Sequence, residues 1–307
     1  MFLCVSEPFL QRDNMCAEPL QLVLSTGDAV PMPDPLNRLA CWRVCKPSPE
    51  SVRKLKAWGR TQGVSLAFFD RLPKWSDFSV LMTDMDHTLI DADVFKELAV
   101  LAGQEERYQR VMTALSEGEL TFDVSLQEKA VLLKGLPESA IEQVVSGLTF
   151  TSGIVTLIDE ARHHNLRTYV LSSGIDDIAQ HLSEMLCMTG AIANHLAIHE
   201  GQLTADIKGP FGGPLLDARG KRCQMNRIAQ ALSMRGAGGA LCCGDGDNDA
   251  LMLKTAGMGI SFYGTFSAVE AANVNINSGG FEWVVDLLGL HERLALPEGG
   301  CDAGVGC

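Results

Sequence analysis

Basic residues are scarce in this sequence of 307 residues. It has 25 Lys and Arg against 38 Asp and Glu, which gives a formal net charge of −13 at pH 7. Nucleic acids and anionic membrane surfaces are bound by clustered Lys and Arg, so this balance argues against both classes of partner. No apolar run approaches the roughly 20 residues that a membrane-spanning helix needs. We therefore expect no binding to nucleic acid and no membrane span.

A signal peptide and a cysteine framework are also lacking. The segment Met1–Leu10 is apolar in places, but it contains Glu7 and has no basic leader, which argues against a secretory signal. The ten cysteines form no Cys-x-x-Cys pair, so free thiols in a reducing cytosol are favoured over disulfides or a zinc site. Cys242-Cys243 ends an apolar run and indicates a buried strand. These features predict a cytoplasmic protein.

What the chain does have is enough apolar sequence, 46% of its residues, to bury a full core, and a length that suits two units. Residues 1–75 are interpreted as a small α+β domain. Within them Ser48-Pro49-Glu50 predicts a helix start, with Ser as N-cap, Pro at the first position and an acid in the first turn. The strands expected here are Leu20–Leu24, Leu39–Val44 and Val64–Phe69, and Leu72–Ser76 is expected to be a linker. No catalytic constellation occurs in this unit, so a folding or oligomerisation role, including a homodimer, is favoured over ligand sensing.

From Phe78 onward, apolar strands alternate with helices. This alternation predicts an α/β fold with a Rossmann-like parallel sheet and helices on both faces, over residues 76–296. The expected strands are Ser79–Thr83, Arg167–Leu171, Gly239–Cys243 and Gly257–Phe262. The expected helices are Ile154–His163, Asp177–Leu186, Arg222–Met234 and Asp249–Ala256. More than 80 residues separate the first two strands, so we expect a helical cap inserted at about 93–150; residues 297–307, rich in glycine, are expected to be a disordered tail.

Two carboxylates, Asp84 and Asp86, follow the first of these strands with one residue between them, and Thr88 comes next. Buried carboxylates without partners cost several kcal/mol each, so their charge is expected to be used. Asp84 suits a nucleophile that forms an acyl-phosphate. Asp86, on the same side, suits the acid that protonates the leaving alkoxide and then activates water. A hard cation such as Mg²⁺ would offset the repulsion between carboxylate and phosphate.

Matching parts lie at later strand ends, where parallel sheets bind their ligands. Asp245, with Asp84 and the Asp86 carbonyl, completes a magnesium site. Lys221 suits neutralisation of the transferred phosphoryl group, and Asp249 suits a partner that orients this lysine. Ser172, with the backbone N–H groups of Ser173 and Gly174 at a helix start, and the side chain of Asn248 suit phosphate binding. Each part alone has a simpler interpretation: the acidic loop as a calcium site, the serines as turn residues, and Lys221 as a surface lysine. The order of the parts along the chain, each at a strand end or helix start, favours one shared site.

Further segments extend this pattern along the chain. They are Asp86–Ile90, Glu97–Ala99, Gly118–Phe122, Ser125-Leu126, Leu132–Leu136, Ala193–Leu196, Gly201–Thr204 and Gly244–Met252. With them, the stretch from about Ser79 to Leu288 resembles the haloacid-dehalogenase-like phosphohydrolase superfamily, and within it the phosphoserine phosphatases. The resemblance implies the nucleophile, acid/base and metal roles argued above, Mg²⁺ as cofactor, Thr88 as a supporting residue, and a small phosphorylated amino acid as substrate.

The sequence departs from the family mainly where the substrate is held. The resemblance implies that Phe122 contacts the substrate, that Asp93 stands where a glutamate binds the ammonium, and that Lys129 stands where an arginine binds the carboxylate. Ser116 stands near a usual methionine. Lysine cannot form the planar fork that arginine makes with a carboxylate, and Asp is one methylene shorter than Glu. Ser173 replaces a usual glycine, His87 a common serine, and Thr265 a frequent lysine.

Three functions remain open at this point. The first is a Mg²⁺-dependent phosphatase that releases serine from O-phosphoserine. The second is a phosphatase or phosphotransferase with the same chemistry and a pocket retuned for another phosphorylated amino acid or biosynthetic intermediate. The third is a non-catalytic regulatory protein, against which the intact pair of Asp84 and Asp86 argues. The departures at the substrate pocket favour neither of the first two.

Overall fold

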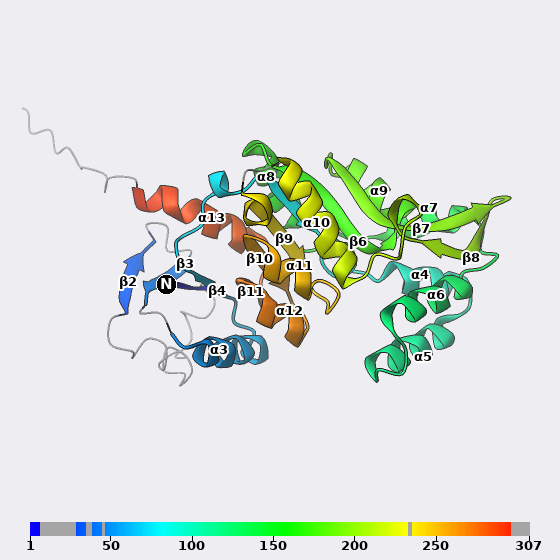
Figure 1. Cartoon of the computed structure of the whole chain (residues 1–307), viewed down its shortest axis with the longest axis horizontal. Helices are drawn as coiled ribbons and strands as arrows, with labels where there is room; N and C mark the ends of the chain where they lie inside the picture. The colour runs from blue at the N-terminus through cyan, green and yellow to red at the C-terminus, as the bar shows by residue number, and fades with distance from the viewer. Residues whose placement is uncertain (7–28, 35–38, 45–46, 233–234, 296–307) are drawn as a thin grey trace, which may run out of the picture.

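The computed structural model describes residues 1–6, 29–34, 39–44, 47–232 and 235–295 (Figure 1). The strand expected at Leu20–Leu24, the end of the helix expected to reach Met234 and the tail 297–307 lie outside these residues. The strands are β1 (Phe2–Ser6), β2 (Val30–Pro33), β3 (Leu39–Arg43), β4 (Leu66–Phe69), β5 (Val80–Thr83), β6 (Arg167–Ile175), β7 (Gly190–His199), β8 (Gln202–Lys208), β9 (Ala240–Gly244), β10 (Met258–Phe262) and β11 (Val274–Ile276). The helices are α3 (Pro49–Gln62), α4 (Val94–Leu101), α5 (Glu105–Ser116), α6 (Phe122–Leu132), α7 (Ser139–Gly147), α8 (Ile154–His163), α9 (Asp176–Met185), α10 (Ala218–Leu232), α11 (Ala250–Thr255), α12 (Phe266–Ala271) and α13 (Glu282–Ala295).

The described strands form one sheet in the order β2-β3-β1-β4-β11-β10-β9-β5-β6-β7-β8. Its middle, from β11 to β7, is parallel, whereas β8 and the four N-terminal strands pair antiparallel. Strands β5, β9 and β10 are buried along their whole length, as expected for apolar strands covered by helices on both faces. The α/β fold with a largely parallel sheet that the alternating pattern predicts is therefore confirmed. No helix in the described ranges is long and apolar enough to cross a membrane.

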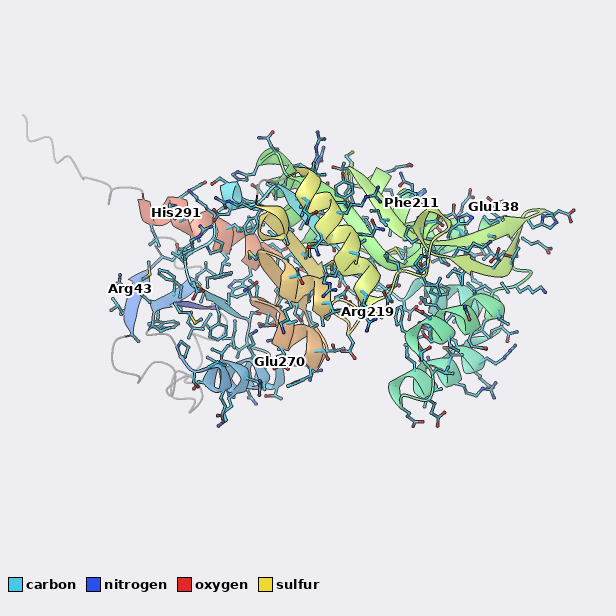
Figure 2. All side chains as sticks on the ribbon, in the orientation of Figure 1. Arg43, Glu138, Phe211, Arg219, Glu270 and His291 are labelled. Atoms are coloured by element: carbon cyan, nitrogen blue, oxygen red, sulfur yellow. The ribbon has the colours of Figure 1, made fainter. Side chains whose placement is uncertain are left out.

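The N-terminal strands continue this sheet through a short junction. Strand β4 pairs antiparallel with β11, with Ala67 opposite Val274. Helix α3 begins after Ser48, whose side chain accepts the N–H of Ser51 as an N-cap. The same helix reaches α12: the Lys56 ammonium donates to the carbonyl oxygens of Glu270 (3.0 Å) and Ala272 (2.5 Å). Arg53 Nε also donates to the carboxylate of Glu270 (labelled in Figure 2) at 2.9 Å. In the segment expected as a linker, Leu72 and Trp75 are buried in the main core.

Helices α4 to α7 occupy the stretch in which a cap was expected, and Figure 1 shows α4, α5 and α6 grouped to one side of the parallel strands. Glycines with positive φ, Gly103 and Gly118, separate α4 from α5 and α5 from α6. Apolar side chains of these helices, such as Leu98 and Leu126, belong to the same core cluster as Leu81 and Val170 of the sheet. The helical insertion therefore packs onto the end of the sheet.

Several elements had no counterpart among the expected ones, including β1, β2 and α12. The hairpin β7–β8 extends the sheet beyond β6, β11 joins the parallel strands to β4, and α13 contacts α8 across one face. Strand β6 is also longer than expected, because it continues through Ser172, Ser173 and Gly174 to Ile175. These three residues form the irregular end of a strand, where the register with β7 shifts, and α9 begins only at Asp176. The expectation that they open a helix is thus corrected.

Candidate active site

A cavity of about 470 Å³ lies where β5, β6 and β9 end and the inserted helices begin. Its lining from the sheet side includes Asp84, Asp86, Ser172, Ser173, Gly174, Asp245 and Asn248, and from the inserted segment Asp93, Phe122 and Lys129. Lys221, Thr88 and Asp249 lie directly beneath, fully buried. The structure therefore brings together all but one of the residues that the sequence suggested. The exception is Ser116, which is exposed and donates its hydroxyl to the Thr113 carbonyl at 2.8 Å.

The floor of the cavity is held by one lysine between two carboxylates. Lys221 Nζ lies 2.8 Å from Asp84 Oδ1 and 2.7 Å from Asp249 Oδ1, and all three side chains are at most 7% exposed. Burial alone would lower the pKa of Lys221, but the two carboxylates raise it above its ordinary value. The lysine therefore stays charged, and it fixes the Asp84 carboxylate at the end of β5. Asp84 Oδ1 also accepts the backbone N–H of Met85, at 2.7 Å.

Asp249 also shapes the acidic loop after β9. Its Oδ2 accepts the backbone N–H groups of Asp245 (3.1 Å) and Gly246 (3.0 Å). This approach needs a glycine at 244, since a Cβ there would lie 2.5 Å from the Asp249 carboxyl carbon. Thr88 donates to Asp245 Oδ1 at 2.9 Å and so helps to fix that carboxylate. Both supporting side chains thus act by positioning acids.

Three carboxylates gather closely enough to share a cation. Asp84, Asp245 and Asp249 each offer an oxygen within 4.8 Å of the others. The oxygens of Asp249 already accept Lys221 and two N–H groups, so Asp84 and Asp245 are the better donors. Burial, followed by the charge of Asp249, raises the pKa of Asp245 to about 6. Carboxylate oxygens gathered in this way are the ligands that a hard cation such as Mg²⁺ takes.

Asp86 sits between this acidic cluster and the cap. Its Oδ1 accepts the N–H of Val94 at the start of α4, at 3.2 Å. Burial, then the charges of Asp93 and Asp84, raises the pKa of Asp86 well above its ordinary value. Gly174 lets the end of β6 pass close by, because a Cβ there would meet Met85 Cε at 2.6 Å and Asp86 Oδ2 at 3.5 Å. A protonated carboxyl group facing the cavity can donate a proton to a bound ligand.

The end of β6 is organised by contacts that the sequence did not reveal. Ser172 Oγ accepts the N–H of Gly174 at 2.9 Å, and Ser173 donates to the Leu216 carbonyl at 2.6 Å. Asn194 on β7 is fully buried; it donates to the Ser173 carbonyl at 2.8 Å and accepts the Leu216 N–H at 2.7 Å. Ser173, found where a glycine is usual, thus anchors the segment before α10. Asn194 lies in Ala193–Leu196, one of the segments that carry the family resemblance. That membership was the available signal that Asn194 has a role.

The cap side of the cavity is mostly apolar. Phe95, Met112, Leu115, Phe122 and Leu126 line it, together with the charged Asp93 and Lys129. Sequence reasoning overlooked Met112 and Leu115, as well as Tyr108, which lies buried behind this wall. The spacing of 108, 112 and 115 along α5 places these side chains on one helix face and could have identified them.

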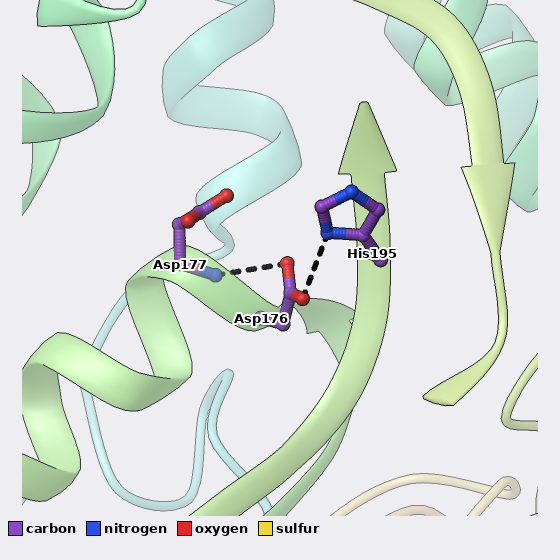
Figure 3. A group of neighbouring side chains, drawn as sticks. All are labelled: Asp176, Asp177 and His195. Carbon is purple, nitrogen blue, oxygen red and sulfur yellow. Dashed lines mark hydrogen bonds and ion pairs between the residues drawn. The ribbon is translucent and has the colours of Figure 1, made fainter. Parts of the chain in front are cut away.

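A second group of metal-ligand side chains lies outside the cavity. Asp176 and Asp177 begin α9, and His195 stands beside them on β7 (Figure 3). Asp176 Oδ2 lies 3.0 Å from His195 Nδ1, and Asp176 Oδ1 accepts the Asp177 N–H at 3.0 Å. Asp177 and His195 are exposed, and Asp176 is in contact with solvent as well. Negative charge is favourable in the first turn of a helix, which accounts for Asp176 and Asp177, and among the described residues nothing beyond these contacts indicates a ligand.

Comparison with known proteins places this geometry in a family. The model of the haloacid dehalogenase-like hydrolases matches residues 81–254. Phosphoserine phosphatase of Haemophilus influenzae is 30% identical over 231 residues, which are 75% of this chain and 72% of that protein. The chain belongs to the haloacid dehalogenase-like hydrolases. Within this family it is a phosphomonoester hydrolase whose relatives include phosphoserine phosphatases.

Solved structures agree with this fold. A HAD family hydrolase from Salmonella enterica subsp. enterica serovar Typhi superimposes with a TM-score of 0.77, at 24% identity, over 94% of this chain and 98% of that one. A phosphoserine phosphatase determined as a phospho-aspartyl intermediate analogue superimposes with a TM-score of 0.61, at 28% identity, over 68% of this chain and 98% of that one. The first likeness extends over the N-terminal strands as well as the parallel sheet.

Proposed function

We propose that the chain is a Mg²⁺-dependent phosphatase that acts through an aspartyl-phosphate and hydrolyses O-phosphoserine to serine and phosphate. The observation that carries this proposal is the position of Asp84. It lines the cavity, it is fixed by Lys221, and it shares a cluster with Asp245 under a wall that bears one acid and one lysine. Phosphoserine phosphatases among the relatives support the choice of substrate.

In the proposed reaction, a carboxylate oxygen of Asp84 attacks the phosphorus atom, and the ester P–O bond breaks as the Asp84–phosphorus bond forms. Asp86, protonated beforehand, gives its proton to the leaving alkoxide of serine. In the second half, Asp86 takes a proton from water, the oxygen of which attacks the same phosphorus atom. Phosphate leaves, and the Asp84 carboxylate is restored.

The remaining residues hold the charge that moves. Lys221 keeps Asp84 oriented and offsets the negative charge around the phosphoryl group. In this proposal, Ser172, Asn248 and backbone N–H groups at the end of β6 bind the phosphate oxygens. Asp84, the Asp86 carbonyl and Asp245 would hold Mg²⁺, and the ion would offset the repulsion between the nucleophile and the phosphate. The oxygen-only donor set of this cluster fits such an ion.

The alternative, a phosphatase or phosphotransferase for another phosphorylated amino acid or biosynthetic intermediate, keeps this chemistry and changes the ligand. It is favoured by the lysine and the shorter acid in the cap wall, which change the geometry while keeping the charges. The two proposals differ only in what occupies the space between Asp93, Lys129 and the floor.

A substrate screen separates them. The purified protein is assayed for phosphate release from phosphorylated amino acids, sugars and hydroxy acids, with Mg²⁺, with EDTA, and with Ca²⁺ added to Mg²⁺. We expect the highest kcat/KM for O-phosphoserine, loss of turnover with EDTA, and inhibition by Ca²⁺, because its looser coordination disturbs in-line attack. A higher kcat/KM for another phosphorylated metabolite would transfer the assignment to the alternative, and full activity in EDTA would overturn the metal proposal.

A further inference from the structure

Tyr108 stands behind the cap wall and contacts both of its charged residues. It is the buried side chain of α5, a helix that the structure describes in full, and it is only 2% exposed. Its hydroxyl donates to Asp93 Oδ2, and its ring lies beneath Lys129, whose Nζ is 5.5 Å from the ring centroid. It does not line the cavity itself. One aromatic side chain therefore connects the acid and the lysine.

The Tyr108 hydroxyl completes the fixation of Asp93. Asp93 is the N-cap of α4, and its Oδ1 accepts the N–H of Lys96 at 3.1 Å. With Oδ2 held by Tyr108, each carboxylate oxygen has one donor within the protein, so rotation of the carboxylate would break both bonds. Each oxygen keeps a second acceptor position for a ligand. A cavity-lining acid fixed in this way presents a defined site for an ammonium group.

The Tyr108 ring acts on Lys129 by a different route. The ammonium of Lys129 lies 5.6 Å from the Phe95 ring centroid as well as near Tyr108, and the residue is only 9% exposed. Within the described residues, ring faces rather than an ion pair hold this ammonium. A cation stabilised by aromatic faces keeps its hydrogen-bond donors for a ligand carboxylate.

We propose that Tyr108 is a positioning residue for substrate selection: its hydroxyl sets Asp93 to receive the ammonium of the substrate, and its ring sets Lys129 to receive the carboxylate. This inference rests on the proposed function, which it extends to the α-amino-acid part of the substrate. It accounts for a pocket that keeps both charges while lacking the longer acid and the forked base. Asp93 is shorter than Glu, and Lys129 lacks the planar fork of Arg. By fixing the positions of both side chains, Tyr108 compensates for these two differences.

The test uses two substitutions and four substrates with the full-length protein. Tyr108→Phe removes only the hydroxyl, whereas Tyr108→Leu removes the ring too. O-phosphoserine has both groups, phosphoethanolamine lacks the carboxylate, 3-phosphoglycerate carries a hydroxyl in place of the ammonium, and p-nitrophenyl phosphate lacks both. A hydrogen bond to a charged group predicts that Tyr108→Phe raises KM for phosphoserine and phosphoethanolamine about tenfold relative to the other two substrates. Tyr108→Leu is expected to raise KM for 3-phosphoglycerate as well, relative to p-nitrophenyl phosphate.

Tyr169→Phe serves as the matched control, since Tyr169 lies near the beginning of β6, away from the strand ends that form the cavity. The Tyr108→Phe result decides the matter even if Tyr108→Leu does not fold. Equal changes of kcat/KM for all four substrates in Tyr108→Phe would reduce Tyr108 to a structural residue and overturn the inference while phosphoserine hydrolysis stands. A wild type that prefers phosphoethanolamine would overturn both the proposed substrate and the role of the ring at Lys129; the same selective loss in Tyr108→Phe would then keep only the role of the hydroxyl at Asp93. A wild type that does not distinguish the four substrates would overturn both.

Discussion

The floor and the cap wall of the same cavity are stabilised by different kinds of contact. On the floor, Asp84, Lys221 and Asp249 are joined by charge-assisted bonds of 2.7–2.8 Å, and every supporting group is itself polar. In the cap wall, Asp93 and Lys129 stand apart among aromatic and aliphatic side chains. In the proposed reaction, the floor would hold the charge that moves, whereas the wall would bind charge on the substrate that does not.

This difference indicates which part of the site can vary. A change on the floor leaves a buried charge without its partner, which costs several kcal/mol. A change in the wall exchanges one ligand contact for another within a tolerant apolar surface. We therefore expect the chemistry to be sensitive to substitution and the specificity to be adjustable. Three variants test this contrast, from its strongest consequence to its weakest.

Asp84→Asn changes the proposed nucleophile at the centre of the floor. The amide has nearly the same shape but cannot form an acyl-phosphate, so we expect kcat to fall at least about 10⁴-fold with the fold intact. Steady-state phosphate release and circular dichroism measure the two effects. Appreciable turnover by the purified variant would refute the assignment of Asp84 as nucleophile.

Lys221→Met removes the cation that the floor shares. Two carboxylates then remain buried without it, so we expect a loss of about 3–5 kcal/mol in the free energy of unfolding, together with a large loss of kcat. Urea denaturation followed by fluorescence gives the first quantity. Lys134→Met, at an exposed lysine, is the matched control. Equal stabilities of the two variants would show that the floor is not held by this lysine.

Asp93→Glu combined with Lys129→Arg changes only the wall. The longer acid and the forked base are expected to raise the kcat/KM ratio of phosphoserine to p-nitrophenyl phosphate by about tenfold, with a small effect on kcat. If the wild type already hydrolyses phosphoserine efficiently and the double change leaves this ratio as it was, the pocket is not retuned and ordinary phosphoserine hydrolysis stands.

The floor was also the part of the site that the sequence predicted best. Asp84 and Asp245 follow short apolar strands, and a buried strand that ends in an acid leaves few physical options for that charge. Ser116 shows the opposite case: the family resemblance suggested that it lies in the pocket, whereas at the end of α5 its side chain is exposed to solvent. Whether such a residue faces the pocket or the solvent depends on which face of the helix it occupies. A sequence pattern predicts that face only where several apolar residues recur at helical spacing.

The same contrast holds for the fold. The strands Val80–Thr83 and Met258–Phe262 are short, buried and mostly apolar, and they lie within one or two residues of where the sequence predicted them. Strand β11 has three residues, and its pairing of Val274 with Ala67 spans some two hundred positions of the chain. Neither local propensity nor periodicity carries information about such a distant partner. Asn194 escaped for a related reason, because its role depends on two segments that meet only after folding.

The pairing of β4 with β11 has a consequence for self-association. A parallel sheet that ended at β11 would present a row of unpaired N–H and C=O groups, which is a template for another chain to add to. Strand β4 covers that row, and the Lys56 ammonium occupies the end of the adjacent α12. The N-terminal strands thus shield an edge that would otherwise be adhesive. A version of the chain that began after residue 75 would keep every residue of the cavity and expose this edge to its neighbours.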